Sequence, residues 1–245
     1  MSSPNNFRKK KMAILFFGLT RSLKDVYKSL KENIFDVLTN NNIEYDIFLH
    51  TYILPTPYIN TYVNTKIENY DNESYKLLKP KYYILENQNK VERKLKIPTY
   101  FSNLSDWASC APTFEKKCYF VRNMVLAQHS KKMVTNLFRE YKADYDYVMF
   151  TRPDQALHTK INPTAFNLLS NNNIIIPKEH SYFGINDRFC IAKPNIAIIY
   201  GNSFTYLLVY SEKKAIVSEV FLKDYLRLNN IHIIYSPITA TLIRM

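Results

Sequence analysis

The stretch Tyr145-Asp146-Tyr147-Val148-Met149-Phe150-Thr151-Arg152-Pro153-Asp154 decides the fold. Its centre, residues 147–151, is apolar and rich in β-formers without polar alternation, which predicts a strand covered on both faces. Pro153 cannot donate a hydrogen bond to a β-ladder and disfavours a helical Arg152, so the strand should end there. Asp154 should therefore lie at the carboxyl edge of a central strand, where open α/β sheets bind ligands.

The segments before this strand predict a parallel β-α-β unit over residues 12–52. Residues 12–17 and 45–52 are predicted strands, and the segment between them repeats apolar residues at helical spacing. Ser22 with Asp25 predicts a capping box at the start of that helix. The two strands should be parallel and joined by a right-handed crossover.

The remaining segments predict one further alternation of strands and helices. Further strands are expected at 82–85, 174–176, 189–192, 231–235 and 239–243, and the last two should close the sheet. Helices are expected at 115–141, at 196–209 after Pro194, and from a cap at Ser218, with a possible short helix at 69–78. Residues 87–114, which contain Trp107, are expected to form an irregular functional loop. We therefore predict a basic flexible tail at 1–11 and a single domain at 12–245. The fold class is α/β, with a mixed, mainly parallel Rossmann-like sheet flanked by helices.

Composition narrows the function classes. The chain has 245 residues, 47% of them hydrophobic, and only three glycines, so neither a GxGxxG nor a GxxxxGK[ST] phosphate loop is present. Three cysteines without CxxC spacing favour a reducing compartment and argue against a zinc site. No apolar run approaches the length of a membrane span. We expect a cytoplasmic protein whose net charge of +12 suits an anionic partner.

Four polar clusters follow predicted strands or precede predicted helices. They are residues 18–21, residues 50–52, residues 152–154, and residues 186–188 together with Glu219. Backbone N–H groups and Arg21 at a helix start predict an anion site, and Tyr52 is a candidate for stacking on a base. A carboxylate at position 154 can hold Mg²⁺ or Mn²⁺ through oxygen. Asp187 or Glu219 can deprotonate an acceptor hydroxyl.

The segments FFGLTRS, YDIFLHTY, YDYVMFTRPD and NDRFCIA, with a Ser-Glu-x-x-Leu helix, resemble a group of small glycosyltransferases. Such enzymes occur in large DNA viruses and bacteria, have a GT-A fold and use nucleotide-diphospho-sugars. The resemblance covers roughly residues 12–235, and its most specific parts are the RPD and NDRF elements. It implies transfer of a sugar, with a UDP-sugar favoured as the donor, to a glycan or other hydroxyl acceptor. If the chain is viral, the host cytoplasm or the virion is its expected location.

The resemblance also implies roles for individual residues. The predicted donor-binding residues are Phe17, Gly18, Leu19, Thr20, Arg21, Thr51, Tyr52, Arg122, Arg152 and Asp154; Asn186 and Arg188 are predicted to bind the acceptor. Asp187 or Glu219 would be the catalytic base of an inverting reaction, and inversion and retention both stay open. GT-A enzymes usually carry a DxD motif for the metal and the diphosphate. Arg152 stands where the first acid would be expected, so Asp154 is the predicted metal ligand, for Mn²⁺ or Mg²⁺.

Two rival functions come from other classes. Pro153-Asp154 with Glu212-Lys213-Lys214 spells the PD…ExK pattern of a metal-dependent nuclease, and a basic chain suits nucleic acid. Glu212 follows an apolar helix and lies far along the chain from Asp154, so we expect no nucleic-acid partner. A non-catalytic glycan-binding module is the second rival, because aromatic-rich loops that include Tyr100, Phe101 and Trp107 offer faces on which a sugar can stack.

Overall fold

A mostly parallel sheet forms the centre of the computed structural model, which describes residues 8–60, 65–68, 70–104 and 113–243. Within these residues seven strands follow the order β10-β8-β9-β6-β1-β2-β5. Their bounds are β1 Lys11–Phe17, β2 Glu44–Ile53, β5 Tyr82–Asn87, β6 Tyr147–Thr151, β8 Asn173–Pro177, β9 Cys190–Ala192 and β10 His232–Ser236. Only β9 runs antiparallel to its neighbours, β6 and β8. The predicted mixed, mainly parallel α/β sheet is confirmed.

The predicted β-α-β unit is also confirmed. β1 pairs in parallel with β2 on one side and with β6 on the other. Phe17, the last residue of β1, lies opposite His50, and Phe16 lies opposite Thr151 at the end of β6. β2 continues beyond this level to Ile53, and the carboxyl ends of all three strands lie at one edge of the sheet.

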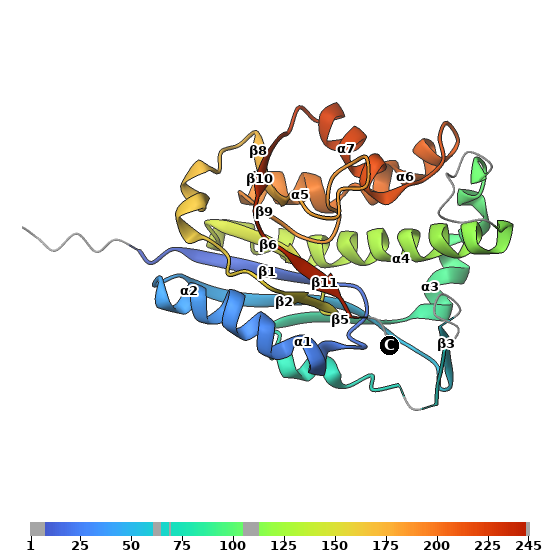
Figure 1. Cartoon of the computed structure of the whole chain (residues 1–245), viewed down its shortest axis with the longest axis horizontal. Coiled ribbons are helices and arrows are strands. Elements are labelled where there is room, and N and C mark those ends of the chain that lie inside the picture. Colours follow the sequence, from blue (N-terminus) through green and yellow to red (C-terminus); the bar gives the residue numbers. More distant parts are fainter. Residues whose placement is uncertain (1–7, 61–64, 69, 105–112, 244–245) are drawn as a thin grey trace, which may run out of the picture.

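Helices cover both faces of the sheet (Figure 1). They are α1 Leu23–Leu30, α2 Asp36–Asn40, α3 Gln88–Leu95, α4 Phe114–Arg139, α5 Pro194–Gly201, α6 Phe204–Ser211 and α7 Ser218–Leu228; a π-helical turn, Lys31–Phe35, joins α1 to α2. Ile14 and Phe16 pack with α1 and α2, whereas Leu15 and Phe17 pack on the face covered by α4, α5 and α7. This alternation follows from the two-residue period of a strand. Because both faces are covered, β1 is apolar throughout.

Two short ribbons lie outside the main sheet. β3 (Tyr58–Asn60) pairs with β4 (Thr65–Ile67), and β7 (Gln155–Leu157) pairs with β11 (Ala240–Leu242). The prediction that the last strand closes the main sheet is therefore wrong: β10 joins the sheet at its edge, but β11 pairs with the segment that follows Asp154. The short 3₁₀ turns are Ser74–Leu78, Ile97–Tyr100, Lys142–Asp144 and Pro163–Leu168.

Three local predictions about helices are also wrong. Ser22 precedes α1 but makes no capping hydrogen bond, because its hydroxyl is buried without a partner. The segment 87–114 is not wholly irregular, since it contains α3, which the Asn87 side chain caps by accepting from the Lys90 N–H. The predicted helix 196–209 is divided into α5 and α6, because the chain turns at 202–203. Trp107 and Cys110 lie outside the described residues.

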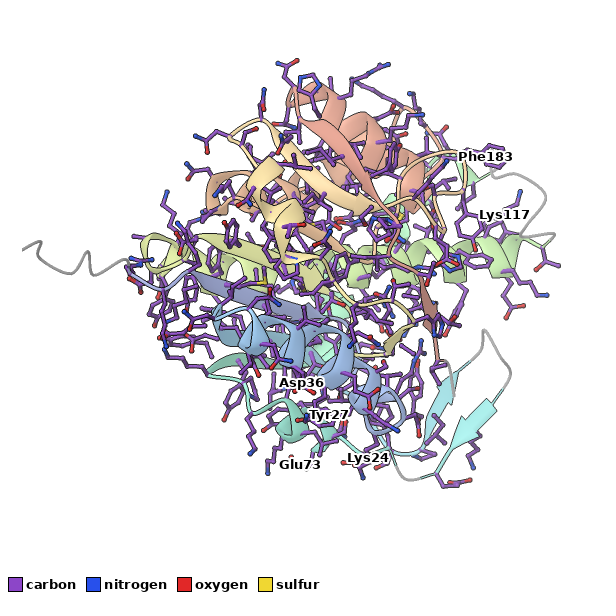
Figure 2. The ribbon with its side chains drawn as sticks, turned by 60° about the vertical axis from the view of Figure 1, so that its left-hand side comes forward. Lys24, Tyr27, Asp36, Glu73, Lys117 and Phe183 are labelled. Atoms are coloured by element: carbon purple, nitrogen blue, oxygen red, sulfur yellow. The ribbon has the colours of Figure 1, made fainter. Side chains whose placement is uncertain are left out.

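The outer surface of α1 and α2 carries charged side chains, among them Lys24 and Asp36, which are labelled in Figure 2. Lys24 forms an ion pair with Asp71 at 2.6 Å across to the neighbouring segment. Over the described part of the chain, no helix is both long and apolar enough to cross a membrane.

Candidate functional site

A cavity of about 150 Å³ lies at the edge of the sheet where four parallel strands end. The carboxyl end of β2 and the segments that follow β1, β5 and β6 supply one wall, which consists of Gly18, Leu19, Arg21, Tyr52, Gln88 and Arg152. This is the edge that the strand order predicts for ligand binding. The structure thus brings five of the predicted donor-binding residues, Gly18, Leu19, Arg21, Tyr52 and Arg152, around one cavity.

The opposite wall of the cavity comes from α4 and β3. It consists of Tyr58, Tyr119, Phe120, Asn123, Leu126 and Ala127. The α4 residues recur at intervals of three, four and one, so they share one face of the helix. The sequence predicted this helix but did not assign its aromatic face to a ligand, because the same spacing is typical of a buried core.

Gly18 gives the first strand its turn into the cavity. Its φ of +98° is a conformation that side chains other than glycine rarely adopt. Its N–H donates to Ser130 Oγ on α4 at 2.8 Å. The Arg152 guanidinium lies over this glycine, within 3.8 Å of where a β-carbon would be. The turn therefore places a backbone segment and an arginine together at the cavity wall.

Asp154 is wholly buried between two arginines. Its carboxylate accepts from Arg152 Nε at 2.8 Å and Nη2 at 2.7 Å, and from Arg21 Nη2 at 3.2 Å. Burial alone would raise the pKa of Asp154, but the charge and hydrogen bonds of Arg152, followed by those of Arg21, hold it below its ordinary value. Arg21 Nε is buried without a hydrogen-bond partner. The two guanidinium groups are thus fixed by one carboxylate, and one buried N–H donor remains for a ligand.

This arrangement does not fit a metal ion at Asp154. Both carboxylate oxygens are occupied by guanidinium donors, whereas Mg²⁺ needs near-octahedral oxygen ligands at about 2.0–2.1 Å. We derive no step through a metal at this carboxylate. The predicted Mn²⁺ or Mg²⁺ stays a prediction, which the nucleotide titration described below tests.

The other predicted donor-binding residues do not line the cavity. Phe17, Thr20 and Thr51 are buried to 2% exposure or less. Phe17 packs edge to face against Phe150, at 6.3 Å between ring centroids. Arg122 faces Glu92 and donates two hydrogen bonds to its carboxylate, from Nε at 3.0 Å and from Nη2. None of these residues is part of the cavity wall.

Asp187 and Glu219 are brought together although 31 residues separate Asp187 from Ser218, the neighbour of Glu219. Ser218 begins α7 and donates its hydroxyl hydrogen to the Asp187 carboxylate, so it does not cap the helix as predicted; Val217 is the N-cap. Burial, and then the negative charge of Asp187, raise the pKa of Glu219 to about 7. A carboxyl group that titrates near neutrality is suited to general acid–base chemistry.

The loop that carries Asp187 is held tightly against α7. The Ile185 N–H donates to the Glu219 carbonyl at 3.0 Å. Asn186, predicted to bind an acceptor, instead donates to the Glu179 carbonyl at 2.9 Å and accepts from the Arg188 N–H at 2.9 Å, so it shapes the loop. Arg188 lies 3.8 Å from the Asp187 carboxylate. The loop thus fixes Asp187 beside the start of α7.

Positive charge links these carboxylates to the cavity. Burial lowers the pKa of Arg152, but the charge and hydrogen bonds of Asp154 raise it above its ordinary value. The charge of Asp187 adds a smaller effect in the same direction as Asp154. Lys131 on α4 is fully buried, its ammonium lies 4.2 Å from the centre of the Tyr200 ring, and burial lowers its pKa to about 8. Asp187 opposes that shift. The structure therefore places Asp187 within electrostatic reach of both Arg152 and Lys131.

The two halves of the PD…ExK pattern have different partners. Asp154 is held by its two arginines, whereas Lys214 pairs with Asp224 on α7 at 3.0 Å. Glu212 lies exposed at the end of α6. No contact in the described part of the chain joins Asp154 to Glu212 or Lys214, so the geometry of a nuclease site is not formed.

Comparisons with known proteins add little to this geometry. No protein-family model and no curated protein sequence matches the chain. Among solved structures, the chain is similar to the apo structure of WbbM, a bifunctional glycosyltransferase, with 12% sequence identity and a TM-score of 0.44. The match covers 96% of this chain and 40% of that one, so the chain spans less than half of that structure. At this level of similarity the site has to be interpreted from its own residues.

Proposed function

We propose that this chain is a glycosyltransferase that moves a sugar from a nucleotide-diphospho-sugar, with a UDP-sugar favoured, to a hydroxyl group of a glycan or other acceptor. The observation that carries the proposal is the cavity at the ends of β1, β2, β5 and β6, where two carboxylate-anchored arginines face aromatic side chains. Neither a hydrophobic ligand nor a cation suits such a wall. A nucleoside diphosphate offers both the anionic and the aromatic part that it requires.

Arg21 and Arg152 are the proposed diphosphate-binding groups. A guanidinium presents several N–H donors in a rigid fork that matches phosphate oxygens. Here Asp154 holds both forks in place before any ligand arrives, and the unpartnered Arg21 Nε is one free donor. As the sugar–phosphate bond breaks, negative charge develops on the leaving diphosphate. Prepositioned positive groups stabilise this charge without reorganising.

The aromatic residues of the opposite wall, Tyr58, Tyr119 and Phe120, are the proposed contacts of the base or the sugar. Glu219 or Asp187 is the proposed base, which takes the proton of the acceptor hydroxyl as its oxygen attacks the anomeric carbon. The raised pKa of Glu219 favours Glu219, because a base that titrates near 7 accepts a proton most effectively at neutral pH.

Nucleotide binding tests the proposal directly. Unfolding temperatures are measured with UDP, GDP, CMP and dTDP, each with and without Mn²⁺. We expect one nucleoside diphosphate, at about 100 times its dissociation constant, to add about 2.7 kcal/mol of stability. Arg21→Gln should abolish the shift, whereas Arg139→Gln, which removes the same charge from the exposed end of α4, should preserve it. A shift that Mn²⁺ does not alter would indicate that the arginines replace the metal.

The outcomes separate the rival functions. A protein that binds no nucleotide contradicts the proposal, and binding of a glycan under those conditions would favour a non-catalytic module. DNA binding whose affinity falls steeply with salt would favour a nucleic-acid enzyme instead.

The pKa of Glu219 predicts how activity depends on pH. With Glu219 as the base, kcat/KM should rise about tenfold per pH unit below about pH 6 and level off above about pH 7.5. Glu219→Gln should lower kcat by about 10²–10⁴-fold and remove this dependence. Glu140→Gln, an exposed residue just after α4, is the matched control. An unchanged pH profile in Glu219→Gln would assign the base to Asp187.

The same shift predicts the stability of the Glu219→Gln variant. The folded pKa of Glu219, about 7, lies above the unfolded value, so its contribution to stability is lost as the pH rises through about 7. The neutral glutamine avoids this loss. We expect Glu219→Gln to be more stable than the natural protein at pH 8 by about 1–2 kcal/mol, and indistinguishable from it at pH 4. Urea unfolding at the two pH values measures the difference.

A further inference from the structure

Three side chains that the proposed reaction does not use meet beside the cavity: His50 on β2, Glu86 on β5 and His129 on α4. One carboxylate oxygen, Glu86 Oε2, lies 2.9 Å from His50 Nε2 and 3.8 Å from His129 Nδ1. All three ligand-type atoms lie within 4.8 Å of one another. The His50 side chain is wholly buried, and 10% of the His129 side chain is exposed. Two imidazole nitrogens thus converge on one carboxylate oxygen.

The hydrogen bonds of Ser130 are compatible with a proton on His50 Nδ1. Ser130 Oγ accepts from the Gly18 N–H at 2.8 Å and lies 3.1 Å from the His50 carbonyl, to which it can donate its single hydrogen. It also lies 2.7 Å from His50 Nδ1, and when the hydroxyl hydrogen is given to the carbonyl, Nδ1 is the donor in that contact. In a neutral imidazole the Nε2 atom then carries a lone pair. That lone pair faces the Glu86 carboxylate oxygen at 2.9 Å, which is unfavourable unless a positive species lies between them.

We propose that His50 Nε2, Glu86 Oε2 and His129 Nδ1 bind one divalent transition-metal ion, with Zn²⁺ as the ion whose chemistry they fit best. Two imidazole nitrogens and one carboxylate oxygen are a ligand set that Zn²⁺ accepts, at about 2.0–2.2 Å per bond. Tetrahedral ligand atoms at that distance lie about 3.3 Å apart. The distances from Glu86 Oε2 to the two histidine nitrogens, 2.9 and 3.8 Å, bracket this value, and all three atoms lie within 4.8 Å of one another, so small side-chain movements would complete the site.

The residues around this site also suit a metal centre. Ligating histidines usually donate their second nitrogen to a neighbouring acceptor, as His50 Nδ1 does to Ser130 Oγ. His129 Nδ1 would give up its 2.9 Å contact with the Tyr52 hydroxyl, which keeps its hydrogen bond to the Leu126 carbonyl at 2.8 Å. The side chain of Glu86 is 25% exposed, which gives an ion and a water ligand a route to the site.

The ion would join three elements that form the cavity. It would connect β2, β5 and α4, and Ser130 would transmit this restraint to the N–H group of Gly18 in the cavity wall. This site is separate from Asp154 and involves no cysteine. The ion is therefore assigned a positioning role for the cavity wall, independent of whether the ligand of the cavity is a nucleotide.

Metal binding to the chelator-treated protein tests the proposal. Zn²⁺ is titrated calorimetrically, and Co²⁺ is added to a second sample because its visible absorption reports nitrogen and oxygen coordination. We expect one ion per chain, a higher unfolding temperature, and proton release on binding. Glu86→Gln and His129→Gln should each weaken Zn²⁺ binding by on the order of 100-fold or more. His232→Gln, which removes an exposed histidine from β10, should leave binding unchanged.

Two results of the titration would contradict a metal site at His50, Glu86 and His129. If Zn²⁺ and Co²⁺ fail to bind, or bind equally well to Glu86→Gln and His129→Gln, the contact between His50 and Glu86 holds a proton and not a metal. Circular dichroism of each variant establishes that it is folded. Nucleotide titration of the same variants keeps this outcome distinct from a failure of the proposed transferase function.

Discussion

Replacing Arg152 with methionine should lower the free energy of unfolding by about 3–5 kcal/mol at pH 7. Arg152 donates two of the three hydrogen bonds that Asp154 receives from the arginines, at 2.8 and 2.7 Å. The Asp154 side chain is wholly buried, so the substitution leaves a carboxylate with only the longer contact to Arg21, at 3.2 Å. A buried charge that loses its partner pays the desolvation penalty that the pair had offset.

Urea unfolding of matched variants measures this effect. Arg139→Met, which removes an exposed arginine from the end of α4, should change stability by less than about 0.5 kcal/mol. Adding Asp154→Leu to Arg152→Met should recover part of the loss, because the unpaired buried charge is then removed. A loss below 1 kcal/mol in Arg152→Met would show that the carboxylate finds other partners.

The pH dependence of the same variant has a defined sign. In the natural protein the folded pKa of Asp154 lies below its ordinary value, so its contribution is present above the unfolded pKa and is lost as the pH falls through the folded pKa. Without Arg152, burial should raise the folded pKa, and protonation should then stabilise the variant. The difference in stability between the two proteins should therefore begin to shrink above about pH 4, as the carboxyl of the variant takes up a proton, and should shrink further as the pH falls through the folded pKa of the natural protein.

The second large effect is expected at Gly184, where alanine should disrupt the loop that carries Asp187. A β-carbon at position 184 would lie 2.0 Å from the carbonyl carbon and oxygen of Glu219 and 2.4 Å from the Val220 nitrogen. These are backbone atoms of α7, so the loop or the helix must move. We expect a loss of about 1–3 kcal/mol in stability. Because misplacement by about 1 Å costs about 100-fold in rate, transfer activity should fall by at least that factor.

Two controls separate the loss of activity from the loss of stability. Gly201→Ala places a β-carbon 1.9 Å from Thr135 Oγ1, between α5 and α4, so it should destabilise the fold through a clash that does not involve the backbone of the Asp187 loop. Phe183→Ala changes the neighbour of Gly184, a side chain that is 96% exposed and stands out from the surface in Figure 2. It should alter stability by less than about 0.5 kcal/mol. If the Gly184→Ala variant is fully active, the loop that carries Asp187 is not part of the catalytic site.

The order of strands and helices was predictable because it depends on local patterns. Apolar runs such as 12–17 and 147–151 can be buried only as strands covered on both faces, and Pro153 ends its strand by its own covalent structure. Parallel pairing then brings the residues after β1 and β6 to the same edge. Gly18, Arg21 and Arg152, which the resemblance to glycosyltransferases implied for one donor site, line one cavity at this edge.

The hydrogen-bond partners of individual side chains were not predictable in this way, because a local partner competes with partners that are distant in the chain. Ser22 has the spacing of a capping residue, but packing buries its hydroxyl without a partner. The hydroxyl of Ser218 binds Asp187 in place of its own helix. A capping hydrogen bond stabilises a helix by only about 1 kcal/mol. Contacts with residues distant in the chain can therefore take the capping side chain away from its own helix.

The sequence by itself determined the alternation of elements, the parallel core and the edge of the sheet at which the cavity lies, since each follows from patterns of residues close in the chain. Only the tertiary structure decided that Asp154 is held by two arginines, that Asp187 lies beside α7, and that His50 and His129 converge on Glu86. Apart from the local pair of Arg152 and Asp154, these contacts join residues that are dozens of positions apart. Strand register and helix packing decide them, because they fix which distant side chains come within hydrogen-bonding distance.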